Sequence, residues 1–217
     1  MNKSLIIGAT GLIGSNLLAL LEKDDFYDTI EVWVRKPFET SSIKTKIKII
    51  DFENIDTNID AKHIFCCIGT TIKKARTWDA FRKIDYNVPV NIAKLCQETN
   101  IEKLIVVSSL GANRYSNNKY LKIKGEMENT ICKIKIPSIT FLRPSILLGN
   151  RQEFRLGELI SKYIIIYFGF LLFGKLKKYR AIHAITVATA MLYIAKENEI
   201  GKRVIESDEI KQIVKKY

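Results

Sequence analysis

Short apolar runs recur along the chain, and segments with a helical spacing of apolar residues separate several of them. Near-continuous apolar runs of this length are typical of strands that are covered on both faces, as in parallel sheets. Their alternation with helices is the pattern of βαβ units. We therefore predict an α/β fold, a doubly wound parallel sheet with helices on both faces. Its strands are expected at 3–7, 30–34, 47–50, 63–68, 103–107 and 138–142.

The helical period is clearest at 15–23 and in the long segment 78–99, where apolar residues recur at spacings of three and four. Pro89 lacks a backbone N–H, so it should kink the second segment or mark a break near Tyr86. Between residues 35 and 47 the helical period is absent. That crossover of the sheet is therefore predicted to be a loop.

The pattern changes after Arg143-Pro144, where a mixed region ends in a helix at 185–195 and a short tail. This C-terminal part is long enough for a small cap over one sheet edge and too short for an independent core. We predict a single domain over residues 1–217, in which 144–217 contribute a small substrate-binding cap.

The composition is that of a globular protein, with 47% hydrophobic and 27% charged residues in 217. The four cysteines form no C-x-x-C pair, and the start of the chain lacks the pattern of a signal peptide. A reduced, cytoplasmic protein without a metal site is the simplest interpretation.

The formal net charge of +12 raises the question of a nucleic-acid partner. The lysines are scattered among many isoleucines, however, and no nucleic-acid-binding motif accompanies them. We predict no specific nucleic-acid partner, and a monomer or a homodimer.

One apolar run, residues 163–173, is flanked by lysines. It is shorter than the roughly 20 residues of a membrane-spanning helix. A buried helix that covers a pocket or lies at a subunit contact is one interpretation. Contact with a membrane surface, with the lysines on anionic headgroups, is the alternative.

A glycine-rich turn follows the first predicted strand and precedes a helix. A helix N-terminus offers unpaired N–H groups and a partial positive charge, and glycines allow a pyrophosphate to approach that backbone closely. The spacing G-x-x-G-x-x-G differs from the commoner dinucleotide pattern G-x-G-x-x-G, and a turn that binds nothing is the alternative. The candidate cofactor-binding residues here are Gly8, Thr10, Gly11, Leu12, Ile13 and Gly14.

Ser108 and Ser109 end the fifth predicted strand, and Tyr120 and Lys124 follow four residues apart on one helical face. An ammonium close to a phenol stabilises the phenolate and lowers the tyrosine pKa. Such a tyrosine can give a proton to a carbonyl oxygen or take one from an alcohol. A serine hydroxyl at the carboxyl end of a strand can hold the same oxygen.

Several motifs occur together along the chain: Gly8-x-x-Gly11-x-x-Gly14, Cys67-Ile68-Gly69-Thr70-Thr71, Asp85-Tyr86-Asn87, Ser108-Ser109-Leu110-Gly111-Ala112, Tyr120-Leu121-x-x-Lys124-Gly125-Glu126 and Arg143-Pro144. Together they resemble the short-chain dehydrogenase/reductase superfamily in its extended or atypical branch, and more narrowly the Tat-interacting-protein-like group with its small bacterial relatives. The resemblance covers residues 3 to 195 and implies a Rossmann fold that binds NAD(P).

The resemblance implies a role for each catalytic candidate. Tyr120 would donate or accept the proton, and Lys124 would bind the nicotinamide ribose and tune that tyrosine. Ser109 would orient the substrate carbonyl. Ser108, counted among the cofactor-facing residues, is the alternative for that role, because only one of two consecutive strand residues faces the site.

The resemblance also implies further cofactor contacts. Gly69 and Thr70 would lie along the pyrophosphate and ribose, and Pro144 and Ser145 would place backbone beside the nicotinamide. Asp51-Phe52 resembles the family's adenine contact, and an acidic loop residue beside a core phenylalanine is the alternative.

The charge at the end of the second strand indicates which cofactor is bound. NAD enzymes tend to carry an acidic residue there for the ribose 2′-hydroxyl, and this chain has Arg35 and Lys36. Two cations favour a 2′-phosphate, so we predict NADP(H) rather than NAD(H). Two solvated side chains without a ligand are the alternative.

The sequence therefore predicts an NADP(H)-dependent oxidoreductase that acts on a small carbonyl or alcohol. An NADPH-binding regulatory or partner-binding protein with little or no turnover is the first alternative. A nucleotide-sugar epimerase or dehydratase is the second, and the short region after Pro144 leaves little room for a sugar-nucleotide pocket.

Overall fold

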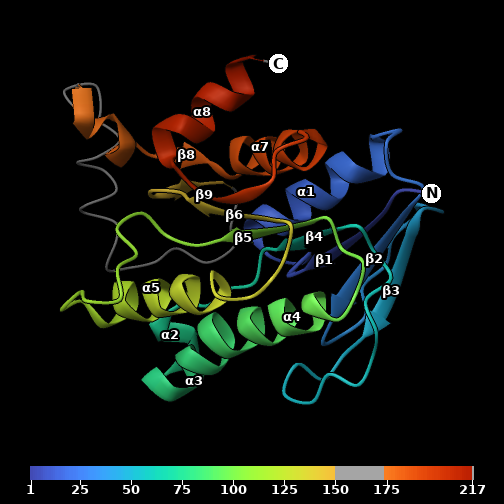
Figure 1. Cartoon of the computed structure of the whole chain (residues 1–217), viewed down its shortest axis with the longest axis horizontal. Helices are drawn as coiled ribbons and strands as arrows, with labels where there is room; N and C mark the ends of the chain where they lie inside the picture. Colours follow the sequence, from blue (N-terminus) through green and yellow to red (C-terminus); the bar gives the residue numbers. More distant parts are fainter. Residues whose placement is uncertain (150–173, 217) are drawn as a thin grey trace.

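The computed structural model describes residues 1–149 and 174–216. Seven parallel strands form one sheet in the order β3-β2-β1-β4-β5-β6-β9, which confirms the predicted fold class (Figure 1). The strand order reverses between β1 and β4, and open α/β sheets bind ligands at the carboxyl ends of the strands beside such a point. The strands of this sheet are β1 Lys3–Ile7, β2 Thr29–Val34, β3 Thr45–Ile49, β4 His63–Cys66, β5 Lys103–Val107, β6 Ser138–Arg143 and β9 Gly201–Glu206.

Helices cover both faces of the sheet (Figure 1). On one face α1, Leu12–Lys23, packs beside α7, Ala184–Lys196, and α8, Ser207–Lys216, packs on α7. On the other face lie α4, Val88–Gln97, and α5, Lys119–Ile131. The two faces have separate apolar cores, one between the sheet and α1 with α7 and one between the sheet and α4 with α5.

The strands divide their side chains between these two cores with the period of two that a strand imposes. In β1, Ile6 belongs to the core beneath α1 and α7, and Leu5 and Ile7 belong to the core beneath α4 and α5. In β5, Ile105 belongs to the core beneath α1 and α7, and Leu104 belongs to the core beneath α4 and α5. Continuous apolar runs are therefore strands with two buried faces, as the sequence predicted.

The long segment predicted as a kinked helix is divided where the sequence placed the break. It consists of α3, Trp78–Arg82, a π-helical turn at Lys83–Asn87, and α4. The Thr77 hydroxyl caps α3 by accepting the Ala80 N–H at 3.1 Å. The break has a simple cause, because Pro89 in the first turn of α4 has no N–H to continue the helical ladder backward.

The C-terminal part supplies more of the sheet than the sequence predicted. We expected six strands and a short tail, and β9 is a seventh strand, hydrogen-bonded to β6, while the tail forms α8. The predicted loop between β2 and β3 is confirmed, since no helix lies there. Besides β9 and α7, the described residues after 144 form β7, Leu147–Leu148, and β8, Ile182–His183, which pair in parallel, and a 3-10 helix at Gly174–Tyr179.

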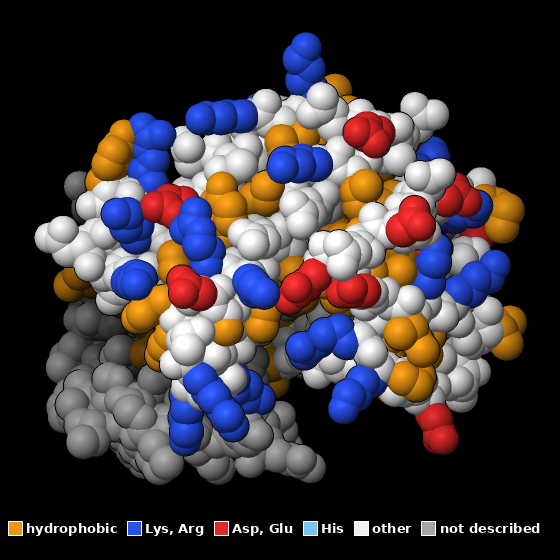
Figure 2. Space-filling model, turned by 90° about the horizontal axis from the view of Figure 1, so that it is seen from below, with side chains coloured by type: hydrophobic (Ala, Val, Ile, Leu, Met, Phe, Trp, Pro, Cys, Tyr) orange, Lys and Arg blue, Asp and Glu red, His pale blue; other side chains and the backbone are white. Residues whose placement is uncertain are grey.

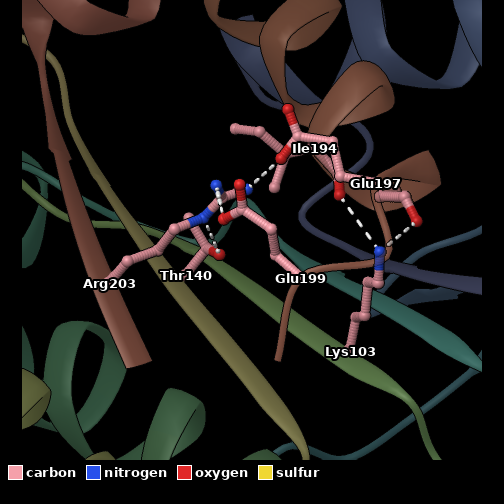
Figure 3. Close-up of polar contacts among 7 residues, drawn as sticks. Lys103, Thr140, Ile194, Glu197, Glu199 and Arg203 are labelled. Atoms are coloured by element: carbon pink, nitrogen blue, oxygen red, sulfur yellow. Dashed lines mark hydrogen bonds and ion pairs between the residues drawn. The ribbon is translucent and has the colours of Figure 1, made fainter. Parts of the chain in front are cut away.

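A buried lysine attaches α7 to the amino edge of the sheet. Lys103, at the start of β5, is 8% exposed, and its ammonium donates to the carbonyl oxygens of Ile194 at 3.3 Å and Ala195 at 2.9 Å (Figure 3). These carbonyls lie in the last turn of α7, where the Ile194 carbonyl also accepts the N–H of the C-cap residue Glu197 at 3.3 Å. A cation at a helix C-terminus also opposes the negative end of the helix dipole.

An arginine on β9 adds a second attachment at this edge. Arg203 donates to the Thr140 hydroxyl at 3.2 Å and forms ion pairs with Glu197 and Glu199, in the segment between α7 and β9 (Figure 3). The seventh strand is thereby fixed by side chains as well as by its ladder to β6.

In the described part of the chain, no helix combines the length and apolar character that crossing a membrane requires. The apolar run at 163–173, for which we predicted a buried helix or a membrane contact, lies outside the described residues.

Candidate active site

The turn between β1 and α1 is so tight that two of its glycines leave no space for a side chain. Gly8 has a φ of +87°, and a Cβ there would lie 2.8 Å from the carbonyl carbon of Cys67. A Cβ on Gly14 would lie 2.1 Å from the Gly8 carbonyl oxygen. The N–H of Gly11 closes the turn by donating to that same oxygen at 3.0 Å. The glycines thus bring the first turn of α1 against β1 and the end of β4.

The N-terminus of α1 has the properties of an anion-binding site. Gly11 is its N-cap and provides no side-chain acceptor for the first N–H groups, and no acidic residue lies in the first turn. Thr10 is exposed, Leu12 is half-buried and Ile13 is buried in the core. Unpaired N–H groups beside a glycine turn fit the pyrophosphate of a dinucleotide.

The loop after β4 continues the same edge of the sheet. A Cβ added to Gly69 would lie 3.3 Å from Asp85 Oδ1 and 3.9 Å from Lys124 Nζ. The Thr70 N–H donates to Asp85 Oδ2 at 2.7 Å. Gly69 and Thr70, predicted to follow the pyrophosphate and ribose, therefore lie directly beside the predicted catalytic lysine.

The predicted catalytic pair lies at the start of α5, as its spacing required. Asn118 caps this helix, and its Oδ1 accepts the N–H of Tyr120 at 3.0 Å and that of Leu121 at 3.2 Å. Tyr120 is half-buried, and its ring lies against Phe81 with 5.5 Å between the centroids. Asn118 therefore holds the backbone of the first turn of α5, and Phe81 packs against the Tyr120 ring.

Lys124, one turn further along α5, is buried and paired with a buried carboxylate. Its Nζ lies 2.7 Å from Asp85 Oδ1, and the two side chains are 4% and 1% exposed. Burial by itself would lower the pKa of this lysine, but the carboxylate of Asp85, with a smaller contribution from Tyr120, raises it above the ordinary value. The ammonium is thus kept charged next to the phenol that it is predicted to tune.

The glycine after this lysine has a packing role. A Cβ on Gly125 would lie 2.3 Å from the backbone nitrogen of Arg114 and 2.3 Å from the carbonyl carbon of Asn113. The loop between β5 and α5 therefore crosses α5 at the residue next to Lys124. This contact explains why the lysine of the motif is followed by glycine.

The two serines after β5 differ in accessibility. The Ser108 N–H donates to the Leu142 carbonyl at 2.8 Å, and its side chain is 5% exposed with no hydrogen-bond partner for Oγ among the described residues. Ser109 is half-buried, and its hydroxyl makes only a long contact of 3.5 Å with the Leu110 carbonyl. Ser109 has the hydroxyl that an incoming oxygen could reach.

The predicted 2′-phosphate residues follow β2, further along the same edge of the sheet. Arg35 and Lys36 are both exposed. Within the described residues neither has a hydrogen-bond or ion-pair partner, so both charges are available to a ligand.

Asp51 and Phe52 follow β3. The Asp51 carboxylate accepts the N–H of Glu53 at 2.9 Å and a side-chain N–H of Asn54 at 3.4 Å, while Phe52 is buried in the core beneath α4 and α5. These contacts are those of an acidic turn residue beside a core phenylalanine. The adenine contact stays a prediction.

Pro144 and Ser145 follow β6 and connect the site to the C-terminal part. The Pro144 carbonyl accepts the Leu110 N–H at 3.1 Å. The Ser145 hydroxyl donates to the Arg180 carbonyl at 2.5 Å and lies 3.0 Å from the Ser207 hydroxyl. Because its hydroxyl is engaged, Ser145 can offer a cofactor only its backbone, which is the role predicted for it.

Asp85 belongs to the motif Asp85-Tyr86-Asn87 but received no role from the sequence, although it contacts both Thr70 and Lys124. One signal could have indicated it. Asp85 lies four residues after Phe81 and three before Val88, on the buried face of the segment, and a carboxylate among apolar core positions needs a partner.

Charged side chains are spread over the face of the molecule formed by α3, α4 and α5. Figure 2 shows Lys and Arg side chains across this face with Asp and Glu side chains among them. A cavity of about 480 Å³ opens between α3 and α5, and its lining includes Trp78, Arg82 and Lys119. Tyr120 and Lys124 are not among the residues that line it.

Sequence comparisons place this arrangement among known proteins. A sequence model of the HIM1 family matches residues 31–164. The chain is 33% identical over 158 residues to Protein FMP52, mitochondrial, of Debaryomyces hansenii, covering 69% of each chain. It is 31% identical over 199 residues to Protein HTATIP2 of Rattus norvegicus, covering 88% of this chain and 80% of the relative. The predicted likeness to the Tat-interacting-protein-like group is confirmed.

The fold also matches solved enzymes of much lower identity. MoeE5 in complex with UDP-glucuronic acid and NAD superposes with a TM-score of 0.71 at 14% identity, covering 96% of this chain and 80% of that one. UDP-N-acetylglucosamine 4-epimerase from Bacillus cereus gives a TM-score of 0.65 at 16% identity, covering 98% of this chain and 83% of that one. At such identities the likeness establishes the Rossmann fold alone.

The names of the relatives correct one prediction. We predicted a cytoplasmic protein because the four cysteines form no C-x-x-C pair and the start of the chain lacks the pattern of a signal peptide. Relatives from several yeasts are named as mitochondrial proteins, and this contradicts the cytoplasmic assignment. The absence of a secretory pattern distinguishes secreted from intracellular proteins and says nothing about which intracellular compartment a chain reaches.

Proposed function

The chain belongs to the HIM1 family, and from that premise we propose that it is an NADP(H)-dependent oxidoreductase of the short-chain dehydrogenase/reductase type, acting on a small carbonyl or alcohol. The observation that carries the proposal is the buried ammonium of Lys124, kept charged one helical turn from Tyr120. A positive charge beside a tyrosine favours transfer of its phenolic proton.

The residues at the sheet edge fit a dinucleotide. Gly8 and Gly14 let the first turn of α1 pack directly against the end of β1, and the helix N–H groups there have no side-chain cap. When bound, a nicotinamide dinucleotide would supply or accept the hydride. Pro144, Ser145, Gly69 and Thr70 would line its path along the edge.

The protein's own part in the reaction is proton transfer. Tyr120 would give its phenolic proton to the carbonyl oxygen as an alcohol forms, and would take that proton back in the reverse direction. Lys124 would stabilise the phenolate through its positive charge and bind the ribose with its remaining N–H groups. Ser109 would donate a hydrogen bond to the same oxygen and orient it.

Charge at the end of β2 supports NADPH over NADH. Arg35 and Lys36 are exposed and unpaired among the described residues, and a 2′-phosphate would supply the anion that both lack. Asp51 and Phe52 would lie beside the adenine.

The experiment has two stages. NADPH and NADH are first titrated against the purified protein, and small aldehydes, ketones and quinones are then screened for loss of the reduced-nicotinamide absorbance. Tyr120→Phe should lose turnover by about two orders of magnitude or more while still binding NADPH, because the phenol acts mainly in the transition state. Tyr115→Phe is the control, since Tyr115 is an exposed tyrosine of the preceding loop. A Tyr120→Phe protein as active as the parent would remove this residue from the mechanism.

A regulatory protein that binds NADPH is the second candidate. The relatives carry the names Protein FMP52 and Protein HTATIP2, which state no reaction. This function predicts NADPH binding without turnover of any compound in the screen, and equal behaviour of Tyr120→Phe and the parent in partner binding.

A nucleotide-sugar reaction is a third candidate, favoured only by the fold of the solved neighbours. It predicts that the dinucleotide stays bound through purification. Protein that is purified free of nucleotide and binds NADPH reversibly would argue against it.

A further inference from the structure

Asp85 joins three segments that the proposed function uses separately. It lies in the π-helical turn Lys83–Asn87, and one of its carboxylate oxygens pairs with Lys124 of α5 at 2.7 Å. The other oxygen accepts the Thr70 N–H of the loop after β4 at 2.7 Å. A single buried side chain thus holds the predicted catalytic lysine and the predicted cofactor loop in one arrangement.

The π-helical turn is what gives Asp85 this position. A π turn inserts an extra residue into a helix and is found frequently at functional sites. Here it separates α3 from α4 and leaves Asp85 1% exposed between the sheet edge and α5. Continuous α-helix through this segment would shift the residue around the helix axis, away from one or both of its partners.

The surroundings of Lys124 leave Asp85 as the group that determines its charge and direction. The titratable groups that act on its ammonium are Asp85 from the π-helical turn, Tyr120 from α5 and the thiol of Cys66 from β4. Among the described residues, Asp85 is the one ion-pair partner of this lysine. A buried ammonium without a partner would be strongly disfavoured.

We propose that Asp85 is the positioning residue of this site: it fixes Lys124 Nζ and the Thr70 N–H relative to one another, so that the lysine faces both Tyr120 and the nucleotide loop. This inference rests on the proposed function, because it assigns Lys124 the task of binding the nucleotide ribose. Asp85 itself transfers no proton.

Asp85→Asn tests the proposal with almost no change of shape. Both partners of Asp85 are donors, and an asparagine side chain has one oxygen and one NH₂ group, so one of the two donors would face an N–H group. NADPH affinity should fall about tenfold, the loss expected for a misplaced charge-assisted hydrogen bond. A purely electrostatic role predicts the opposite sign, because removing a negative charge near a polyanionic ligand would tighten binding. Unchanged or tighter binding would overturn the proposal.

Glu128→Gln is the matched control. Glu128 lies one turn beyond Lys124 on the same helix, is 5% exposed, and pairs with Arg143 instead of with Lys124. Its substitution removes a buried carboxylate from α5 without touching Thr70 or Lys124. NADPH affinity should remain that of the parent, and an equal loss in both variants would show that the effect comes from weakening α5 in general.

A titration without any ligand separates this inference from the proposed function. Lys124 is followed by NMR of ¹³Cε-labelled lysine, assigned by comparison with Lys124→Arg. In the parent it should titrate above the surface lysines, and in Asp85→Asn its midpoint should fall while in Glu128→Gln it stays. If the parent binds no NADPH, the proposed function fails. The titration of Lys124 then still tests whether Asp85 pairs with it. If Asp85→Asn does not fold, the unmutated protein still provides a test. The proposal is overturned if its Lys124 titrates at the same pH as the surface lysines or at a lower pH.

Discussion

The Tyr27 hydroxyl lies 2.8 Å from Nδ1 of His63, and both side chains are buried at the amino edge of the sheet, opposite the candidate site. The His63 ring is stacked on Phe26 with 5.8 Å between the centroids. Burial, reinforced by the positive charge of Lys103, lowers the pKa of His63 from 6.5 to about 4, although Glu102 acts in the other direction. The imidazole is therefore neutral in the folded protein at neutral pH.

This pair makes stability depend on pH in a defined window. Between pH 6.5 and about 4 the unfolded chain binds a proton at His63 that the folded chain does not. The free energy of unfolding should therefore have its full value above pH 6.5 and should fall by about 3 kcal/mol as the pH drops from 6.5 to about 4. Urea denaturation at several pH values measures it. His63→Gln, which cannot titrate, should flatten this part of the profile, and a slope equal to that of the parent would assign the effect to other groups.

Gly125 couples the packing of α5 to the position of the catalytic pair. Gly125→Ala would place a Cβ 2.3 Å from the Asn113 carbonyl carbon, so that α5 or the loop must move. We expect a loss of about 2 to 4 kcal/mol in the free energy of unfolding and weaker NADPH binding, because Lys124 is the neighbouring residue. Thermal or urea denaturation with NADPH titration checks both. Lys122→Ala on the exposed side of α5 should change neither stability nor NADPH binding. A Gly125→Ala protein as stable as the parent would show that the loop at Asn113 can move without loss of stability.

The elements that the sequence predicted well are those whose cause is local. Gly8 and Gly14 are required by a turn that β1 and α1 form together, and a strand, a glycine turn and a helix can be recognised in sequence order. The break near Tyr86 follows from Pro89, which cannot continue a helix. In both cases the residue type and its neighbours carry the information.

The elements that were missed depend on contacts between distant segments. The strand β9 has the sequence GKRVIE, which contains no apolar run and so was not recognised as a strand. It is polar because an edge strand buries few of its side chains. Asp85 meets Lys124 only after α5 has packed beside the π-helical turn. Its importance could be suspected from a carboxylate on an apolar helix face, but its partner is decided by the tertiary fold.

The serines after β5 can be separated by two single substitutions. Ser109→Ala should lower kcat/KM by about two orders of magnitude, because its half-buried hydroxyl is the one within reach of a substrate oxygen. Ser108→Ala should be nearly neutral for stability and affect turnover only a few-fold, since it removes a buried hydroxyl that has no partner among the described residues. Steady-state kinetics with the best compound of the screen measures both. A larger loss in Ser108→Ala would transfer the orienting role to that residue.

Arg35 and Lys36 give a prediction that depends on the cofactor rather than on the substrate. Replacing both by alanine should weaken NADPH binding by ten- to a hundredfold, the effect of two lost charge-assisted contacts to a phosphate, and leave NADH binding nearly unchanged. Added salt should weaken NADPH binding to the parent more than to the double variant, because exposed charges are screened. Fluorescence titration with both nucleotides measures this, with Lys46→Ala on the exposed side of β3 as the control for general loss of positive charge. If NADPH and NADH bind the parent equally well, the two cations do not select the phosphate and the preference for NADP(H) is wrong.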